Sequence, residues 1–146
     1  MKFLYLSLLI LIVMAYSTAR ENQLQTSTLV VNIDGLQSND GKVRIALSNS
    51  EESYSSDGKD AYRGGDAQIT NKKALYTFTE VPYGVYAVKL FHDENNNDKL
   101  DSNFMGIPQE PYGFSNNARG TFGPASWDDA KFEIKEDSLV ISITVQ

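Results

Sequence analysis

The sequence predicts an all-β fold, a two-sheet antiparallel β-sandwich of about seven strands with one long ordered loop. Three observations support this prediction. Apolar residues alternate with a period of two, these residues are mostly β-branched or aromatic, and turn-forming residues separate the runs at short intervals. After residue 20, no stretch keeps a period of 3.6, so no helix is expected. A β-barrel is the alternative arrangement for such strands.

The first two strands are expected on either side of an Asp-Gly turn. Leu29, Val31 and Ile33 alternate along the first strand, and a similar alternation marks the second over 43–47. Between them, residues 38–41 read Ser-Asn-Asp-Gly, and Asp-Gly between alternating apolar runs is a strong local hairpin signal. The sequence therefore predicts a hairpin at this point.

The middle of the chain gives two further strands joined by a short turn. A polar stretch over 48–65 precedes a short expected strand at 68–70. Asn71 and Lys72 then form a turn into a longer strand over 74–78, where apolar residues again occupy every second position. These two strands are expected to be neighbours.

A proline-containing turn at 81–84 leads into the most apolar strand of the chain, over 85–91. Because both faces of this strand are apolar, we expect it to be central in its sheet. The last two strands are expected at 130–134 and 139–145, joined by a turn at 136–137.

Residues 1–19 are predicted to be a signal peptide. Lys2 precedes an apolar run over 3–15, and small residues follow at 17–19. The run is shorter than the about 20 residues that a membrane-spanning helix needs, and an uncleaved anchor is the alternative reading. Cleavage would leave one domain over 20–146, exported to the periplasm or the extracellular space. The chain contains no cysteine, so we expect neither a lipid-anchoring thiol nor disulfides.

The charge of the chain restricts its partners. The formal net charge is −6, and an acidic surface repels phosphate backbones, so nucleic acid is not an expected partner. After the predicted cleavage, no segment is apolar enough to span a membrane, and no basic amphipathic helix favours anionic lipid.

The sharpest motif is a ladder of oxygen-bearing residues directly after the strand over 85–91. Side-chain oxygens at alternate positions can surround a hard cation, and calcium accepts six to eight of them in irregular geometry. We expect weak calcium binding, with a dissociation constant of roughly 10⁻⁴ to 10⁻³ M, because few of the ligands are charged. The predicted ligands are Asp93, Asn95, Asn97, the carbonyl of Lys99, and Asp101.

The ladder departs from a helix-loop-helix calcium site. Asp98 stands where glycine usually makes the bend, and Phe104 stands where a bidentate glutamate would close the shell. A closing carboxylate would have to come from elsewhere, with Asp128, Asp129 or Glu110 as candidates. The alternative is a solvated turn in which the Asp and Asn side chains bond to their own backbone.

A long segment over 102–127 lacks periodicity but is rich in aromatic residues, which predicts an ordered and functional loop. We expect its aromatic side chains to fold inward as a small second core; exposure, for stacking on sugars or peptides, is the alternative. Polar residues beside them offer hydrogen-bond donors to a glycan or an envelope protein. The candidate ligand-binding residues are Tyr112, Phe114, Asn116, Asn117, Arg119 and Trp127.

Catalysis is not expected. His92 is the chain's one histidine, and its sequence neighbour Asp93 would point to the opposite face of a strand. No G-x-S-x-G motif and no zinc-ligand spacing is present. We therefore expect His92 to be a half-buried strand-end residue. A small hydrolase using paired carboxylates is one alternative, and a purely structural envelope protein without a ligand is another.

Several short motifs have a distinctive spacing across nearly all of the chain beyond the signal peptide. They are Ile33-x-Gly35-Leu36, Pro82-x-Gly84-x-Tyr86, and the runs 92–101, 106–108, 112–119 and 122–124. In these motifs the chain resembles a family of exported bacterial proteins catalogued as domain of unknown function 2141. The resemblance implies a bacterial source and a secreted or periplasmic location, and it brings no established activity. Asp98 departs from the pattern, because the family usually has glycine there.

The turn-and-strand pattern also resembles the transthyretin-like and carboxypeptidase-regulatory sandwiches, which belong to the prealbumin-like and Ig-like architectures. These are mostly accessory or binding modules, and the likeness is one of fold alone. The sequence therefore predicts an exported, non-enzymatic module that is stabilised by calcium and binds a glycan or protein through residues 102–127.

Overall fold

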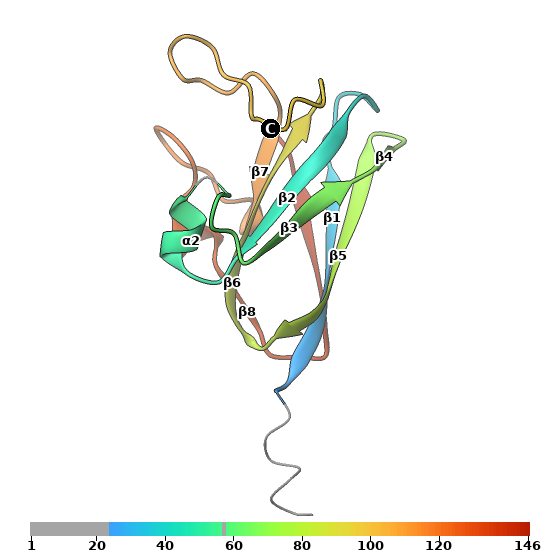
Figure 1. Cartoon of the computed structure of the whole chain (residues 1–146), viewed down its shortest axis with the longest axis vertical. Helices are drawn as coiled ribbons and strands as arrows, with labels where there is room; N and C mark the ends of the chain where they lie inside the picture. Colours follow the sequence, from blue (N-terminus) through green and yellow to red (C-terminus); the bar gives the residue numbers. More distant parts are fainter. Residues whose placement is uncertain (1–23, 57) are drawn as a thin grey trace, which may run out of the picture.

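Two β-sheets packed face to face form the protein (Figure 1). The computed structural model describes residues 24–56 and 58–146, so the predicted signal peptide over 1–19 lies outside the described residues. The first sheet contains, in spatial order, β4 (Ile69–Thr70), β5 (Lys73–Pro82), β1 (Thr26–Asp34) and β9 (Ser138–Thr144). The second contains β3 (Arg63–Ala67), β2 (Lys42–Ser48), β6 (Gly84–Asp93) and β7 (Tyr112–Phe114), and β8 (Phe132–Ile134) also pairs with β6.

This arrangement confirms the predicted two-sheet β-sandwich, and β6 is central as expected, since it pairs with β2, β7 and β8. The strands in the described residues number nine. The two additional ones, β3 and β7, lack an alternating apolar pattern. Strand β3 reads Arg-Gly-Gly-Asp-Ala and is held by its backbone pairing with β2. Within the described ranges, no helix is long and apolar enough to cross a membrane.

The Asp-Gly turn does not form the predicted hairpin. Strands β1 and β2 lie in different sheets, so residues 38–41 carry the chain across the sandwich. The turns at 81–84 and 136–137 do the same, linking β5 to β6 and β8 to β9. The turn at Asn71 and Lys72 does join neighbours, β4 and β5. Both residues adopt positive φ angles, 53° and 58°, as a two-residue hairpin requires.

Strand β9 runs parallel to β1, which corrects the expectation of a wholly antiparallel sandwich. The reason is the crossing at 136–137: the chain enters β9 from the other sheet, so its direction is not set by a hairpin with β1. The register places Leu29 beside Leu139 and Ile33 beside Ile143. Parallel pairing therefore still directs the apolar residues of both strands into the interior.

Short helical segments correct the expectation of no helix. They are α2 (Glu51–Ser55), the 3₁₀ turn η1 (Ser115–Asn117) and α3 (Trp127–Ala130). Each α-helix begins at a serine cap: Ser50 Oγ accepts from the Ser53 N–H at 3.2 Å, and Ser126 Oγ accepts from the Asp129 N–H at 3.2 Å. Helices of four or five residues are too short to show a period of 3.6.

Apolar side chains from both sheets fill the space between them and form the main core. Tyr86, Val88 and Leu90 contribute to this core from one face of β6. Ala87, on the opposite face, belongs to a second cluster. The buried members of that cluster, which include residues of α2 and α3, are Tyr54, Ala87, Phe114, Ala125 and Ala130. The segment after β7 is therefore anchored to the outside of the second sheet.

Candidate functional site

The loop after β6 is organised around Asp93, the last residue of that strand. Its side chain is fully buried. Oδ1 accepts a hydrogen bond from the backbone N–H of Asn97, and Oδ2 accepts one from that of Asp98, both at 3.0 Å. Because a buried carboxylate is costly unless it is hydrogen-bonded, these two bonds fix the chain in a tight curl.

The two asparagines predicted as metal ligands direct their amide nitrogens at Asp101. Asn95 Nδ2 donates to Asp101 Oδ2 at 2.6 Å, and Asn97 Nδ2 lies 3.0 Å from Oδ1 and 3.1 Å from Oδ2. Their oxygens accept from the backbone: Asn95 Oδ1 from Asn97 N–H at 3.0 Å, and Asn97 Oδ1 from Lys99 N–H at 2.8 Å. The predicted ligand residues are thus gathered into one network, built as successive Asx turns.

Asp98, which stands where a calcium loop usually has glycine, adopts the left-handed conformation itself, with φ of 65°. Cations of β2 hold its carboxylate: Lys42 Nζ lies 2.7 Å and Arg44 Nη1 lies 3.0 Å from Oδ1. The hydrogen bond from Lys42 is the main reason that the pKa of the Asp98 carboxyl is lowered. Sequence reasoning missed both cations, because nothing in the local pattern shows which loop lies beside β2.

Of the three carboxylates predicted as candidates to close a metal shell, Glu110 is bonded to this loop, whereas Asp128 and Asp129 lie on α3. Glu110 is buried. Its Oε1 accepts from the backbone N–H of Glu94 at 3.0 Å, and its Oε2 accepts from that of Asp101 at 2.9 Å. Glu110 therefore clamps the start of the loop to its end.

In residues 24–56 and 58–146, no three His, Cys, Asp or Glu side chains are placed to hold a metal ion together. The predicted calcium shell contains two carboxylates, Asp93 and Asp101, and takes its other oxygens from amides and a carbonyl. Of the carboxylates predicted to close this shell, Glu110 is bound to the backbone N–H groups of Glu94 and Asp101, and Asp128 and Asp129 lie on α3.

The segment over 102–127 is ordered by its own hydrogen bonds. Asn103 Oδ1 accepts from the backbone N–H groups of Met105 and Ile107, at 2.9 and 3.1 Å, which closes a small turn. The expectation that the aromatic side chains fold inward is wrong for Phe104 and Phe122, which are 96% and 101% exposed. Phe104 lies in the turn that Asn103 closes, and Phe122 lies in the bend over 121–124.

The other aromatics of the segment do pack inward. Phe114 is buried, and its ring lies 5.7 Å from that of Tyr112, edge to face. Trp127 packs its ring against Tyr54 at 5.8 Å. Burial raises the pKa of Tyr54 to about 12, and its hydroxyl donates to the Ala125 carbonyl at 3.0 Å. The inward aromatics thus form the second core that the sequence predicts.

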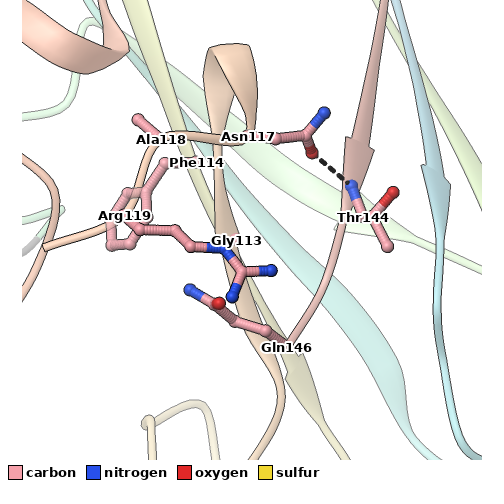
Figure 2. Close-up of a pocket in the computed structure, with 7 residues that line it drawn as sticks. All are labelled: Gly113, Phe114, Asn117, Ala118, Arg119, Thr144 and Gln146. Atoms are coloured by element: carbon pink, nitrogen blue, oxygen red, sulfur yellow. Dashed lines mark hydrogen bonds between the residues drawn. The ribbon is translucent and has the colours of Figure 1, made fainter.

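A pocket of about 230 Å³ opens between β7, η1 and the end of β9. Figure 2 shows Arg119 and Gln146 directing their side chains toward one another in this pocket. Three of the six predicted ligand-binding residues line it. The full lining is Gly113, Phe114, Asn117, Ala118, Arg119, Thr144 and Gln146, hereafter the Arg119 pocket.

The other three predicted residues are placed elsewhere. Asn116 has a structural role, since its Nδ2 donates to the carbonyls of Asp129 and Lys131 at 3.1 and 2.9 Å. Tyr112 pairs through its backbone with Gln146, with N–O distances of 3.2 and 3.0 Å. Trp127 lines a separate cavity of about 230 Å³, which Tyr54, Lys89, Pro124 and other residues of α2 and the 124–126 stretch complete.

A rigid turn positions the Arg119 pocket. Asn116 and Asn117 both have positive φ, 59° and 50°, a conformation that asparagine tolerates better than most residues. Asn117 Oδ1 accepts from the Thr144 backbone N–H at 2.8 Å (Figure 2). Ser115 Oγ, fully buried, accepts from Val88 N–H at 2.9 Å and donates to the Ala130 carbonyl at 2.6 Å. The turn is thereby tied to both sheets.

Residues from distant parts of the chain complete the pocket, and sequence reasoning did not find them. Thr144 and Gln146 follow the alternating pattern of a last strand and show no sign of a site. Gly113 gives a weak signal: a Cβ there would lie 2.7 Å from Ile143 Cγ2, so glycine lets β7 pack closely against β9. The close approach brings the two strands together at the pocket.

His92 lies at the end of β6, as predicted, but it is fully buried rather than half-buried. Its Nε2 lies 2.7 Å from the Asp40 carbonyl oxygen. Its Nδ1 lies 3.6 Å from Glu94 Oε1 and has no hydrogen-bond partner among the described residues. The imidazole therefore links the 38–41 turn to the loop after β6.

Fold and site together define a class: a small β-sandwich domain with an Asp/Asn-rich loop and a polar pocket at the edges of its two sheets. The chain belongs to the family of uncharacterized proteins conserved in bacteria, DUF2141, whose model matches residues 31–142. The family resemblance drawn from the motifs is confirmed. Comparisons with curated proteins and with solved structures give no match, so the likeness to transthyretin-like sandwiches stays a prediction.

Proposed function

We propose that this chain is an exported, non-enzymatic module that binds a glycan or envelope-protein partner through its 102–127 segment, with calcium stabilising the loop after β6. One observation carries the binding part of the proposal. Arg119 lines a pocket, and its guanidinium has no hydrogen-bond or ion-pair partner in the described part of the chain. An unpaired guanidinium at a preformed cavity is suited to receiving a polar partner.

The position of the pocket supports the same function. Binding residues are often carried on loops that a rigid scaffold holds in place. Here Ser115 and Asn117 fasten the turn to both sheets, while Arg119 is left exposed. The backbone of the turn is therefore held in place, while the Arg119 side chain is unpaired and can meet a partner.

The charge pattern of the loop after β6 supports the calcium part. Asp93, Asp101 and Glu110 belong to one hydrogen-bonded network, and none of the three has an ion-pair partner within the described residues. Calcium would add the missing positive charge, with Asp93, Asn95, Asn97, Lys99 and Asp101 as ligands. On binding the ion, the Asp101 carboxylate would give up its hydrogen bonds from the amide groups of Asn95 and Asn97 and coordinate calcium instead.

A non-enzymatic role is supported by the surroundings of the residues suited to catalysis. His92, the chain's one histidine, has no exposed surface, and a general base must come within hydrogen-bond reach of its substrate. The Arg119 pocket contains no carboxylate, histidine or cysteine side chain. Its side chains can hold a ligand, and among them Thr144 alone carries a nucleophilic group.

The test of the binding function is a screen of the mature chain, residues 20–146, on an array of bacterial-envelope and matrix glycans and against solubilised envelope proteins. Arg119→Gln is screened in parallel. We expect a defined ligand that the variant binds at least tenfold more weakly. Lys135→Gln, which changes the same charge at a distant surface pair with Glu133, is the matched control. Equal binding by all three proteins would reject the Arg119 pocket as the site.

A further inference from the structure

We infer that the Arg119 pocket takes a carboxylated sugar, such as a uronic acid residue of an acidic polysaccharide. This inference rests on the proposed glycan-binding function and names the chemical class of ligand at the same site. Three features carry it: an unpaired guanidinium at the pocket, a cavity the size of a single ring, and neutral polar side chains around it.

The guanidinium is the first feature. Three arginines lie in the described residues, and two of them are occupied: Arg44 pairs with Asp66 and Asp98, and Arg63 donates to the carbonyls of Thr79 and Glu80. Arg119 has no such partner among those residues. Because a guanidinium binds a carboxylate through two parallel hydrogen bonds, Arg119 specifies an anionic, planar group.

The backbone on either side of Arg119 is fixed, which places its Cα beside the pocket. Before it, the Asn117 side chain is bonded to Thr144. After it, Gly120 packs so closely that a Cβ would overlap the carbonyl oxygens of Gly123 and Pro124. A fixed backbone reduces the ordering cost of binding, so the site is prepared for a ligand rather than formed by one.

The volume limits what enters. At about 230 Å³, the pocket is smaller than the roughly 300 to 1,000 Å³ of sites that enclose drug-sized ligands. It accommodates one sugar ring or one side chain. A polymer would therefore present one residue to Arg119 while its neighbours lie across the surface.

The other polar groups favour a sugar over a peptide carboxylate. Asn117 Nδ2, the Thr144 hydroxyl and the Gln146 amide are neutral groups that match ring hydroxyls in hydrogen bonding. An extended peptide would need free backbone groups at a strand edge. Here the Thr144 N–H is bonded to Asn117, and Gln146 is paired in both directions with Tyr112. The strand edge at the pocket is already occupied.

The experiment is calorimetric titration of the mature chain at low salt with trigalacturonate and with the uncharged galactotriose. We expect trigalacturonate to bind at least tenfold more tightly, since charge-assisted hydrogen bonds to a carboxylate are about twice as strong as neutral ones. Arg119→Gln should remove this preference, and Arg119→Lys should restore it in part, because lysine keeps the charge and loses the two-point geometry. Lys135→Gln should match the unaltered chain.

The outcomes separate this inference from the proposed function. Equal affinity for the two trisaccharides, or a preference that survives Arg119→Gln, overturns the carboxylate assignment and leaves glycan binding standing. Binding of acetyl-trialanine in its free carboxylate form and not as its amide, with no trigalacturonate binding, assigns the pocket to a peptide terminus and also overturns it. An array on which the chain binds no glycan overturns the glycan-binding function itself. Unchanged melting temperatures of the variants establish that they fold.

Discussion

The side-chain oxygen of Asn117 accepts a hydrogen bond from the backbone N–H of Thr144 at 2.8 Å. This contact joins the turn after β7 to the exposed edge of β9, in the other sheet. It places Arg119 beside the end of β9 and occupies a backbone donor that an added strand would otherwise use. The pocket and the protection of the sheet edge therefore depend on one residue.

Asn117→Ala should destabilise the protein by about 1 to 3 kcal/mol. The change removes the acceptor for the Thr144 N–H and puts alanine at a positive φ of 50°. Asn117→Asp keeps an oxygen acceptor and tolerates the same backbone angle, so it should cost much less. Urea denaturation gives both values. Equal losses for the two variants would contradict the role assigned to this hydrogen bond.

Ser115→Ala should lower the free energy of unfolding by about 1 to 3 kcal/mol, because it leaves the buried Val88 N–H without its acceptor. Ser27→Ala is the matched control. Ser27 is also buried, and its hydroxyl has no hydrogen-bond partner in the described residues. Its removal should be neutral or stabilising, as measured by urea midpoint. A loss at Ser27 as large as that at Ser115 would show that hydrogen bonding is not the cause.

Calcium at 10 mM should raise the stability of the mature chain by about 1.4 to 2.7 kcal/mol, the range expected at 10 to 100 times the dissociation constant. Asp101→Asn should abolish this gain, since it removes one of the two carboxylates of the proposed shell. Asp128→Asn, on α3 and outside the loop, should leave it intact. Thermal melting with calcium and with chelator measures the effect. Identical midpoints in both conditions would contradict the metal site.

The stability of the protein should fall above pH 10 partly through Tyr54. Burial raises its folded-state pKa from 10.0 to about 12, so its contribution is complete below the unfolded-state pKa and is lost as the pH rises toward 12. Urea midpoints from pH 9 to pH 11 should therefore decline more steeply for the unaltered chain than for Tyr54→Phe. Parallel curves for the two proteins would show that Tyr54 does not titrate this way.

Several features of the fold could be predicted because they depend on neighbours in sequence. Alternation over 29–33 and 43–47 predicts strands, since successive side chains point to opposite faces. Apolar residues on both faces of 85–91 predict a central strand, which β6 is. The period of oxygen side chains from Asp93 to Asp101 likewise predicts a curled loop, and these residues do form one network.

Other features could not be predicted, because local pattern does not identify the partner across a sheet. Residues 38–41 have the chemistry of a hairpin turn and instead cross between the sheets. Glu110 is far along the chain from Glu94, yet it fixes that end of the loop. The cations that hold Asp98, Lys42 and Arg44, come from β2. The sequence does not show which loop lies beside the outward-facing side chains of that strand.

The sequence by itself determined the all-β class, the faces that each strand buries, the family and the residues of the Asp/Asn loop. The tertiary structure decided which strands are neighbours, the parallel direction of β9 and the assembly of the Arg119 pocket from Gly113, Asn117, Thr144 and Gln146. The physical reason is that the apolar side of an alternating strand can be buried against any apolar surface. The choice among such faces is made by the packing of the whole chain, and the pocket lies where that choice brings two sheet edges together.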